Sequence, residues 1–268
     1  MLLYLIRHGE AENNSNDLFP DDLSADYSLT QRGVEQVMTT AQQLKALNID
    51  EVVSSPVRRA RETAELIAST LGKGVRLDER LREAGLGSLR GKKWQEVVDR
   101  DPQWYMEYFG PWVKYGIEKY DSIRERMVSA VKENLHLGSV VMVSHLEPIR
   151  SVIGVALGLS GPQLRKVKIY NASISVLRVP DVEGSTWDLL AVNWLPINAY
   201  KRLRCGLYRK LIKRTTDLAL QGVEEVKSAF KKRFVSVRQS VLREPGKNSQ
   251  PANKMHNATS GTATLSSM

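Results

Sequence analysis

Short apolar runs alternate with longer amphipathic segments over the first two thirds of the chain. The runs at 2–6, 52–53 and 139–143 are typical of strands that are buried on both faces. Apolar residues at helical spacing predict helices between and after them, over about 30–47 with Thr30 as the cap, 56–71, 121–136 and 148–158. Segments 173–179 and 186–193 predict two strands joined by a turn, so the sheet should end in an antiparallel pair. This alternation predicts an α/β fold, a three-layer α/β/α sandwich around a mostly parallel sheet.

An aromatic-rich insertion, residues 92–120, interrupts this alternation. Its aromatic side chains are Trp94, Trp104, Tyr105, Tyr108, Phe109, Trp112, Tyr115 and Tyr120. Such a helical insertion suits a lid over the carboxyl ends of the strands. It equally suits a small satellite core, and the sequence alone leaves both interpretations open.

The basic character of the chain lies at its C-terminal end. Residues 200–244 carry 13 Lys and Arg against 4 Asp and Glu, whereas residues 1–199 carry 24 against 26. Apolar positions spaced by three or four predict one or two basic amphipathic helices there. Such helices suit an acidic membrane surface, nucleic acid or a protein partner, or else they pack on the preceding domain with a solvated basic face. The polar segment 245–268 predicts a disordered tail.

Composition excludes several classes of protein. The chain has 268 residues and a single cysteine, Cys205, which rules out an intramolecular disulfide framework and a cysteine-based metal knuckle. No segment has the length of a signal h-region or of a membrane span, so we expect a cytoplasmic protein.

Basic and imidazole side chains follow three of the predicted strands. Arg7 and His8 follow the first strand, Arg58 and Arg59 the second, and His145 the third. Open α/β sheets bind ligands at the carboxyl ends of their strands, where these groups should meet. A neutral imidazole can accept a phosphoryl group at pH 7, and forked guanidinium donors neutralise phosphate oxygens. The pattern therefore indicates phosphate chemistry.

At these residues the sequence resembles the histidine phosphatase superfamily, also called the phosphoglycerate mutase-like family. The matching pieces, in order, are LIRHGEAENN at 5–14, SLTQRGVEQ at 28–36, SSPVRRARETAE at 54–65, LREAGLGSLRG at 81–91, VSHLEPIRSVIGVALGL at 143–159 and NASISVL at 171–177. They span about 5–180, so residues 1–199 are the expected catalytic domain.

The resemblance implies a role for each matched residue. It makes His8 the phosphorylated histidine, Glu83 the general acid and base, and His145 the second histidine of the pocket. The implied phosphate ligands are Arg7, Asn14, Arg59 and His145. It implies a small phosphorylated substrate, no cofactor and no metal, and His145 either cationic or hydrogen-bonding. For Arg58 and Arg61, solvated helix charges are at least as good an interpretation as a role.

Two departures from the family pattern affect the pocket. Leu146-Glu147-Pro148 replaces the small residues that often follow the second histidine, and Ala11 replaces a common threonine. Glu147 would repel a second anionic group unless it points away or meets a cation on the substrate.

The insertion bears on the choice between hydrolysis and mutase chemistry. Mutases of the family carry a paired-arginine segment there, whereas residues 92–120 have only scattered cations, namely Lys92, Lys93, Arg100, Lys114 and Lys119. We therefore expect a phosphomonoester hydrolase acting on an apolar or aromatic substrate. Alternatives are phosphoglycerate mutase-type transfer, or a binding module that uses residues 200–244 and retains secondary catalysis. A homodimer is a further option that the sequence leaves open.

Overall fold

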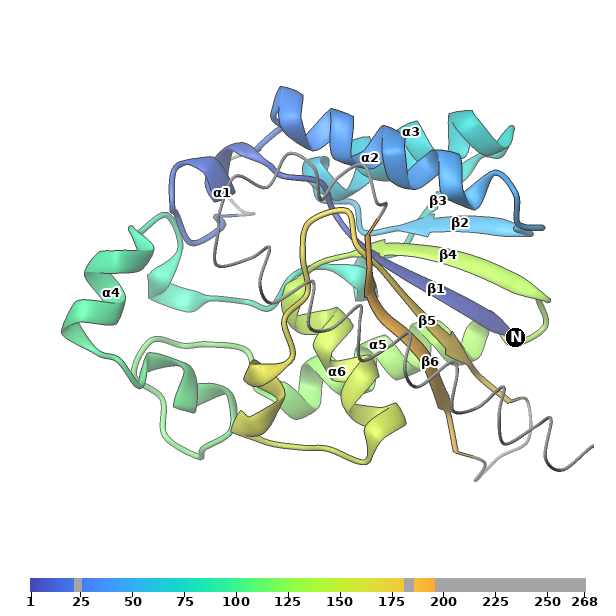
Figure 1. Cartoon of the computed structure of the whole chain (residues 1–268). Coiled ribbons are helices and arrows are strands. Elements are labelled where there is room, and N and C mark those ends of the chain that lie inside the picture. The colour runs from blue at the N-terminus through green and yellow to red at the C-terminus, as the bar shows by residue number, and fades with distance from the viewer. Residues whose placement is uncertain (22–25, 181–185, 196–268) are drawn as a thin grey trace, which may run out of the picture. The chain divides into compact units, whose positions relative to one another are not determined.

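The computed structural model describes residues 1–21, 26–180 and 186–195, which form a six-stranded sheet with helices on both faces (Figure 1). The strands are β1 (Leu2–Arg7), β2 (Glu51–Ser54), β3 (Val75–Leu77), β4 (Ser139–Ser144), β5 (Ile174–Arg178) and β6 (Asp188–Trp194). Their order is β3-β2-β4-β1-β5-β6. The first four strands of that order pair in parallel, and β5 is antiparallel to both β1 and β6. The mostly parallel sheet with an antiparallel end is confirmed.

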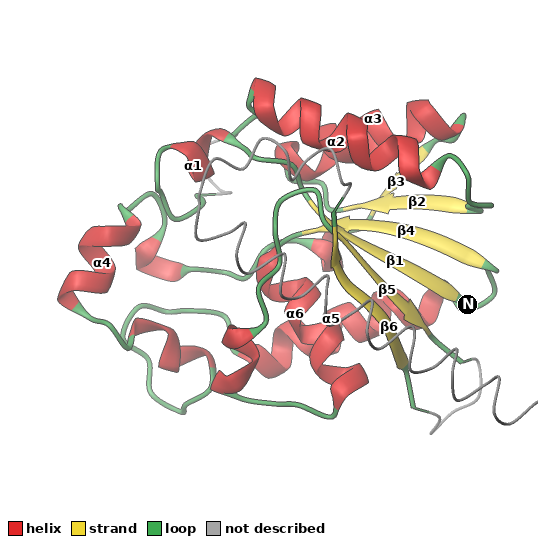
Figure 2. Cartoon of the chain, viewed as in Figure 1, coloured by secondary structure: helices red, strands yellow, loops and turns green. Residues whose placement is uncertain are grey.

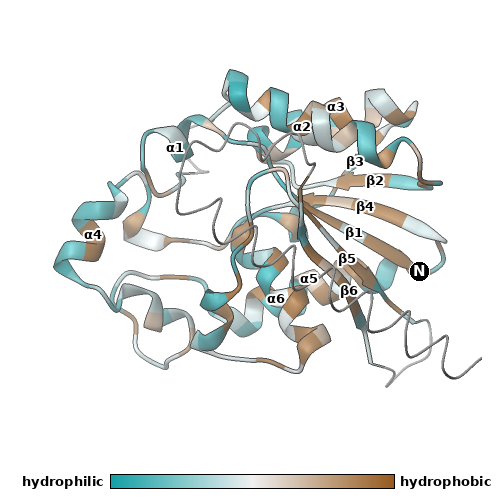
Figure 3. Cartoon of the chain, in the orientation of Figure 1, coloured by the Kyte–Doolittle hydropathy of each residue, from teal (hydrophilic) through white to brown (hydrophobic). Residues whose placement is uncertain are grey.

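Alternate side chains of each central strand enter two different cores. Tyr4 and Ile6 pack into one apolar cluster, and Leu3 and Leu5 into the other, as the two-residue period of a strand requires. All four are buried, which explains why β1 is a continuous apolar run rather than an alternating one. The strands are accordingly among the most apolar parts of the chain (Figure 3).

Helices cover both faces of the sheet (Figure 2). The helices are α1 (Glu12–Ser15), α2 (Gln31–Leu44), α3 (Arg58–Leu71), α4 (Trp94–Arg100), α5 (Tyr120–Glu133) and α6 (Leu146–Leu157). The pair α2 and α3 lies on one face, and the pair α5 and α6 on the other (Figure 1). Thr30 caps α2 as predicted, its side chain accepting from the Gly33 N–H at 3.0 Å. The three-layer sandwich is therefore confirmed, although α6 begins two residues before the predicted start at 148.

The aromatic insertion builds a third core of its own. Trp104, Tyr108 and Tyr120 are almost fully buried there, together with Phe19 and Ile123. In Figure 1, β1 runs from the N-terminus toward the side of the sheet on which α4 lies. The insertion thus forms the satellite core and also lies toward the carboxyl ends of the strands.

The predicted basic helices at 200–244 and the tail at 245–268 lie outside the described residues. The boundary at 199 and the cytoplasmic location stay predictions. Among the helices that the structure describes, none is both long enough and apolar enough to cross a membrane.

Candidate functional site

The carboxyl ends of three parallel strands bring the predicted residues together. Pairing of β1 with β4 sets Arg7 opposite Ser144, and the N–H of His8 donates to the Ser144 carbonyl at 3.0 Å. On the other side of β4, the N–H of Ser55 donates to the Val143 carbonyl, also at 3.0 Å. The register of the sheet therefore places the segments that carry His8, His145 and Arg59 next to one another.

The hydrogen bonds of His8 fix which ring nitrogen is free to react. Nδ1 lies 2.7 Å from the Gly9 carbonyl oxygen, which can only accept, so Nδ1 carries the proton. Nε2 therefore has a lone pair, and it accepts from Arg59 Nε at 3.2 Å. Burial lowers the pKa of His8 well below its ordinary 6.5, and the charges of Arg59 and Arg7 lower it further. His8 is thus a neutral imidazole at pH 7 with Nε2 as its nucleophilic atom.

Arg59 lies between the two histidines. It is 1% exposed, and Nη2 donates to His145 Nδ1 at 3.1 Å. Because that nitrogen accepts, His145 carries its proton on Nε2 and donates to Ser55 Oγ at 2.9 Å. Burial and Arg59 hold the pKa of His145 well below 6.5. Of the two predicted states of His145, the structure shows the neutral, hydrogen-bonding one.

Arg7 directs an unused donor into the same region. Its Nη1 donates to the Ile169 carbonyl at 2.7 Å, while its buried Nε has no hydrogen-bond partner among the described residues. Burial lowers the pKa of Arg7 to about 10, so the guanidinium remains cationic at neutral pH. A buried donor without a partner costs about 1–3 kcal/mol, which an anion at this point would recover.

Glu83 is held by the first backbone groups of α6. One carboxylate oxygen accepts from the N–H groups of Ala84 at 2.9 Å and Glu147 at 3.2 Å, and the other accepts from Leu146 at 3.1 Å. Burial raises the pKa of Glu83, and the charge of Glu147 raises it further. The N–H of Ala84 and the charges of Arg59 and Arg7 lower this pKa, but the raising effects are larger. A carboxyl with a raised pKa keeps its proton to a higher pH than an ordinary glutamate, which suits a group that protonates a leaving group.

The charge of Glu147 is neutralised inside the protein. Its carboxylate pairs with Arg150 Nη1 at 2.7 Å, and Arg165 Nη1 lies 4.0 Å away. The Glu147 and Arg150 side chains are both more than nine-tenths buried. The sequence-based expectation was that Glu147 points away or meets a cation on the substrate. The structure shows a third arrangement, in which the cations that meet Glu147 belong to the chain itself.

Asn14 contacts the first motif rather than the arginine and histidine groups. Its Oδ1 accepts from the Ala11 N–H at 3.1 Å and from Asn171 Nδ2 at 3.3 Å. Asn171 Nδ2 in turn donates to the His8 carbonyl at 3.1 Å. In these contacts Asn14 positions the loop that carries His8, and its predicted contact with phosphate stays a prediction.

Three polar residues support the site without having been singled out from the sequence. Asn171 holds the His8 loop, and Ser55 accepts from His145. Thr63 Oγ1 accepts from the Gly9 N–H at 3.1 Å and donates to the Arg59 carbonyl at 2.7 Å. All three lie within segments that match the family pattern, but their contacts with the site depend on how distant segments pack.

Close backbone packing also fixes the His8 loop. A Cβ on Gly9 would lie 2.8 Å from the Gly33 carbonyl oxygen, and a Cβ on Gly33 would lie 2.0 Å from the Glu10 carbonyl oxygen. Only glycine therefore allows α2 to approach the first motif this closely. Arg58 and Arg61, in contrast, are surface residues that pair with Glu62 and Glu65, as the solvated-charge interpretation predicts.

The site thus combines a buried neutral imidazole, two buried guanidinium groups and a protonatable carboxyl. Within the described residues, no three His, Cys, Asp or Glu side chains gather where they could hold a metal ion. The family model of the histidine phosphatase superfamily (branch 1) matches residues 3–195. The chain belongs to this superfamily.

Members similar to this histidine phosphatase superfamily chain include both mutases and phosphatases. A 2,3-bisphosphoglycerate-dependent phosphoglycerate mutase of Thermoplasma acidophilum is 34% identical over 177 residues, which are 65% of this chain and 86% of the relative. Among solved structures, a mycobacterial glucosyl-3-phosphoglycerate phosphatase with VO3 is 26% identical with a TM-score of 0.64, covering 72% of this chain and 98% of that one. A phosphoserine phosphatase from Entamoeba histolytica in complex with 3-phosphoglyceric acid is 27% identical with a TM-score of 0.61, covering 72% and 96%.

Proposed function

We propose that this protein hydrolyses small phosphomonoesters through a phosphohistidine formed on His8. The observation that carries the proposal is the hydrogen-bonding of His8, in which the Gly9 carbonyl occupies Nδ1 and leaves Nε2 toward Arg59. A nucleophile with a fixed orientation beside buried cations is the arrangement that phosphoryl transfer requires.

In the first step, His8 Nε2 attacks phosphorus in line and the ester P–O bond breaks. Arg7 and Arg59 stabilise the charge on the equatorial phosphate oxygens, and His145 contributes as a neutral hydrogen-bonding group. Arg59 exchanges its hydrogen bonds to the imidazoles for bonds to phosphate as the substrate enters. Glu83 transfers its proton to the leaving oxygen, so no free alkoxide forms.

In the second step, the Glu83 carboxylate takes a proton from water and the water oxygen attacks phosphorus. The P–N bond breaks, its electron pair returns to Nε2, and inorganic phosphate leaves. Positive charge from the two guanidinium groups serves where other phosphatases use metal ions, so the proposed reaction is metal-independent.

Hydrolysis is favoured over mutase transfer by what the insertion does with its cations. Lys114 pairs with Asp101 at 2.6 Å. Lys119 donates to the carbonyls of Glu107, Gly110 and Trp112 at 2.7–2.9 Å. Both lysines therefore bind groups within the insertion and do not form a pair that binds a substrate carboxylate.

The test is to supply 3-phosphoglycerate with 2,3-bisphosphoglycerate and to follow inorganic phosphate and 2-phosphoglycerate together, next to a panel of other phosphomonoesters. Release of phosphate that depends on His8 supports the hydrolase. Formation of 2-phosphoglycerate faster than release of phosphate would instead make the chain a mutase, like the named Thermoplasma relative.

A further inference from the structure

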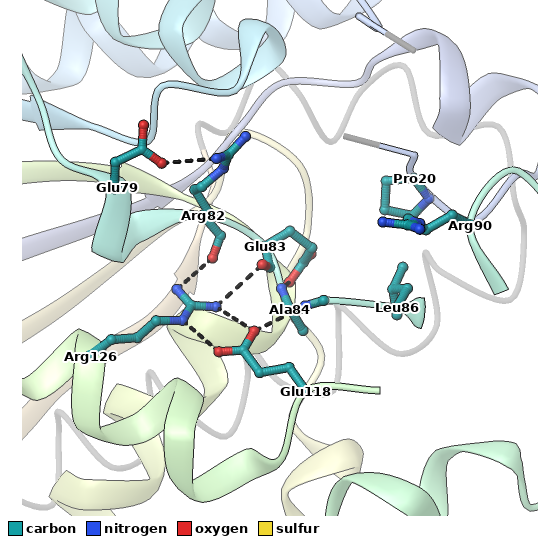
Figure 4. Close-up of a pocket in the computed structure, with 10 residues that line it drawn as sticks. Pro20, Glu79, Arg82, Glu83, Ala84, Leu86, Arg90, Glu118 and Arg126 are labelled. Atoms are coloured by element: carbon teal, nitrogen blue, oxygen red, sulfur yellow. Dashed lines mark hydrogen bonds and ion pairs between the residues drawn. The ribbon is translucent and has the colours of Figure 1, made fainter. Parts of the chain in front are cut away.

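A cavity of about 330 Å³ opens beside Glu83 (Figure 4). Its lining residues are Pro20, Glu79, Arg82, Glu83, Ala84, Gly85, Leu86, Arg90, Glu118 and Arg126. The volume is at the small end of ligand pockets, which range over roughly 300–1,000 Å³. The proposed proton donor Glu83 forms part of its wall, whereas Arg7, His8, Arg59 and His145 are not among its lining residues.

Most charged side chains around the cavity are already paired with one another. Arg126 donates to both carboxylate oxygens of Glu118, at 2.9 and 3.1 Å, and to the carbonyls of Arg82 and Glu83. Arg82 Nη1 donates to Glu79 at 2.9 Å. These pairs, drawn as dashed lines in Figure 4, form part of the wall.

Arg90 is the exception among these arginines. Its guanidinium makes no hydrogen bond or ion pair with any residue in 1–21, 26–180 or 186–195, and it lies on the Pro20 side of the cavity, away from the Arg126–Glu118 pair (Figure 4). Pro20 and Leu86 lie beside this cation and add an apolar part to the lining (Figure 4). A proton donor on one side of the cavity and a cation with apolar neighbours on the other suit a short leaving group that ends in an anion.

The aromatic residues of the insertion do not line this cavity, and most of them pack in the satellite core. The sequence-based expectation of an apolar or aromatic substrate rested on those side chains. The cavity favours a charged leaving group instead.

We propose that this cavity receives the leaving group and that Arg90 binds a second anionic group on it, which selects small phosphomonoesters with two negatively charged ends. This inference rests on the proposed hydrolase function. A carboxylate and a second phosphate share the chemistry that a guanidinium recognises, so the test includes both.

The experiment compares kcat/KM for matched substrates that differ in the distal group. One arm pairs 3-phosphoglycerate with glycerol 3-phosphate, and the other pairs propane-1,3-diol bisphosphate with 3-hydroxypropyl phosphate. Wild type should prefer the anionic member of at least one pair, and the arm in which it does so identifies the anion. Arg90→Gln should reduce that preference about tenfold, the value of one partly exposed charged hydrogen bond. Arg100→Gln is the matched control, since Arg100 is, like Arg90, an exposed arginine, and it does not line this cavity.

A charge reversal separates recognition from a general structural effect. Arg90→Glu should lose the anionic substrates and gain activity on O-phosphoethanolamine, whose leaving group ends in a cation. Equal losses on every substrate, or no loss on any, would overturn the inference. If Arg90→Gln behaves as wild type while p-nitrophenyl phosphate is still hydrolysed through His8, only the role of Arg90 fails. Absence of any His8-dependent hydrolysis would overturn the proposed function together with this inference.

Discussion

Substitution of Arg59 tests how the two imidazoles are held and how phosphate charge is stabilised. Its Nε and Nη2 contact His8 and His145 at 3.2 and 3.1 Å, from a side chain that is 1% exposed. Arg59→Lys keeps the charge but offers a single terminal nitrogen, which cannot reach both rings at these positions. Arg59→Met keeps approximate length and removes both donors and the charge.

The expected losses follow from the number of hydrogen bonds removed. A hydrogen bond involving a charged group contributes about 1.5–3 kcal/mol, so the lysine variant should phosphorylate His8 about 10- to 150-fold more slowly. The methionine variant loses two such bonds and should be about 10²- to 10⁴-fold slower, comparable with removal of an oxyanion-hole donor.

The pH dependence gives an independent readout of the same contact. The charge of Arg59 is one of the causes that hold the pKa of His8 below 6.5. His8 attacks only when neutral, so wild type should keep its phosphorylation rate below about pH 6.5 and lose it only as the pH falls through the lowered pKa. In Arg59→Met that cause is absent, the pKa of His8 rises, and the acid limb moves to higher pH.

The assay is single-turnover phosphorylation by p-nitrophenyl phosphate over a range of pH, with thermal unfolding to confirm that each variant folds. Arg58→Met is the matched control, because Arg58 precedes Arg59 on α3 but pairs with Glu62 on the surface. A methionine variant at position 59 with the wild-type rate, or with an unmoved acid limb, would refute the reasoning.

Three further substitutions or truncations test other parts of the account. Glu83→Gln should slow phosphorylation by alkyl esters about 10²- to 10⁴-fold but hardly affect p-nitrophenyl phosphate, and equal losses would mean that Glu83 is not the acid. Glu147→Gln removes a charge that raises the pKa of Glu83, so the basic limb of kcat/KM for alkyl esters should move to lower pH; an unmoved limb would contradict this. Truncation after Asn198 changes the formal charge from +9 to −2. It should abolish salt-sensitive binding to acidic liposomes or RNA and should leave hydrolysis intact. Lost hydrolysis with unchanged binding would show that the removed segment serves catalysis and not binding.

The central strands were predictable from the sequence because both of their faces are buried. β3 was not predicted because it is short. Continuous apolar runs identify β1 and β4 because both faces of each strand pack against helices. β3 has three residues, Val75–Leu77, none of them fully buried, so no apolar run or alternation reveals it. α6 was predicted to begin at Pro148, but proline is tolerated throughout the first turn, and the helix begins at Leu146.

The site was predictable where strand ends converge and unpredictable where contacts join distant backbone groups. Arg7 ends β1, and the other three site residues, His8, Arg59 and His145, come after strands that pair in the sheet, so their proximity follows from the topology. The bond from Asn171 to the His8 carbonyl spans 163 positions, and nothing in the local pattern marks it.

Glu147 makes one contact that the sequence could have predicted and one that it could not. Its partner Arg150 lies three residues later on α6, a spacing at which side chains on one helix meet, so this ion pair was open to prediction. The approach of Arg165, which also lies over the rings of Trp104 and Tyr105, depends on how the insertion packs. That packing is not visible in the sequence.

Trapping the covalent intermediate tests the central claim most directly. Wild type mixed briefly with labelled p-nitrophenyl phosphate and quenched in base should retain a phosphoryl group that is stable in alkali and lost in acid, and peptide mapping should place it on His8. His8→Ala should retain none and should not turn over. A wild-type enzyme that releases phosphate without forming this adduct, or substantial turnover by His8→Ala, would contradict the account.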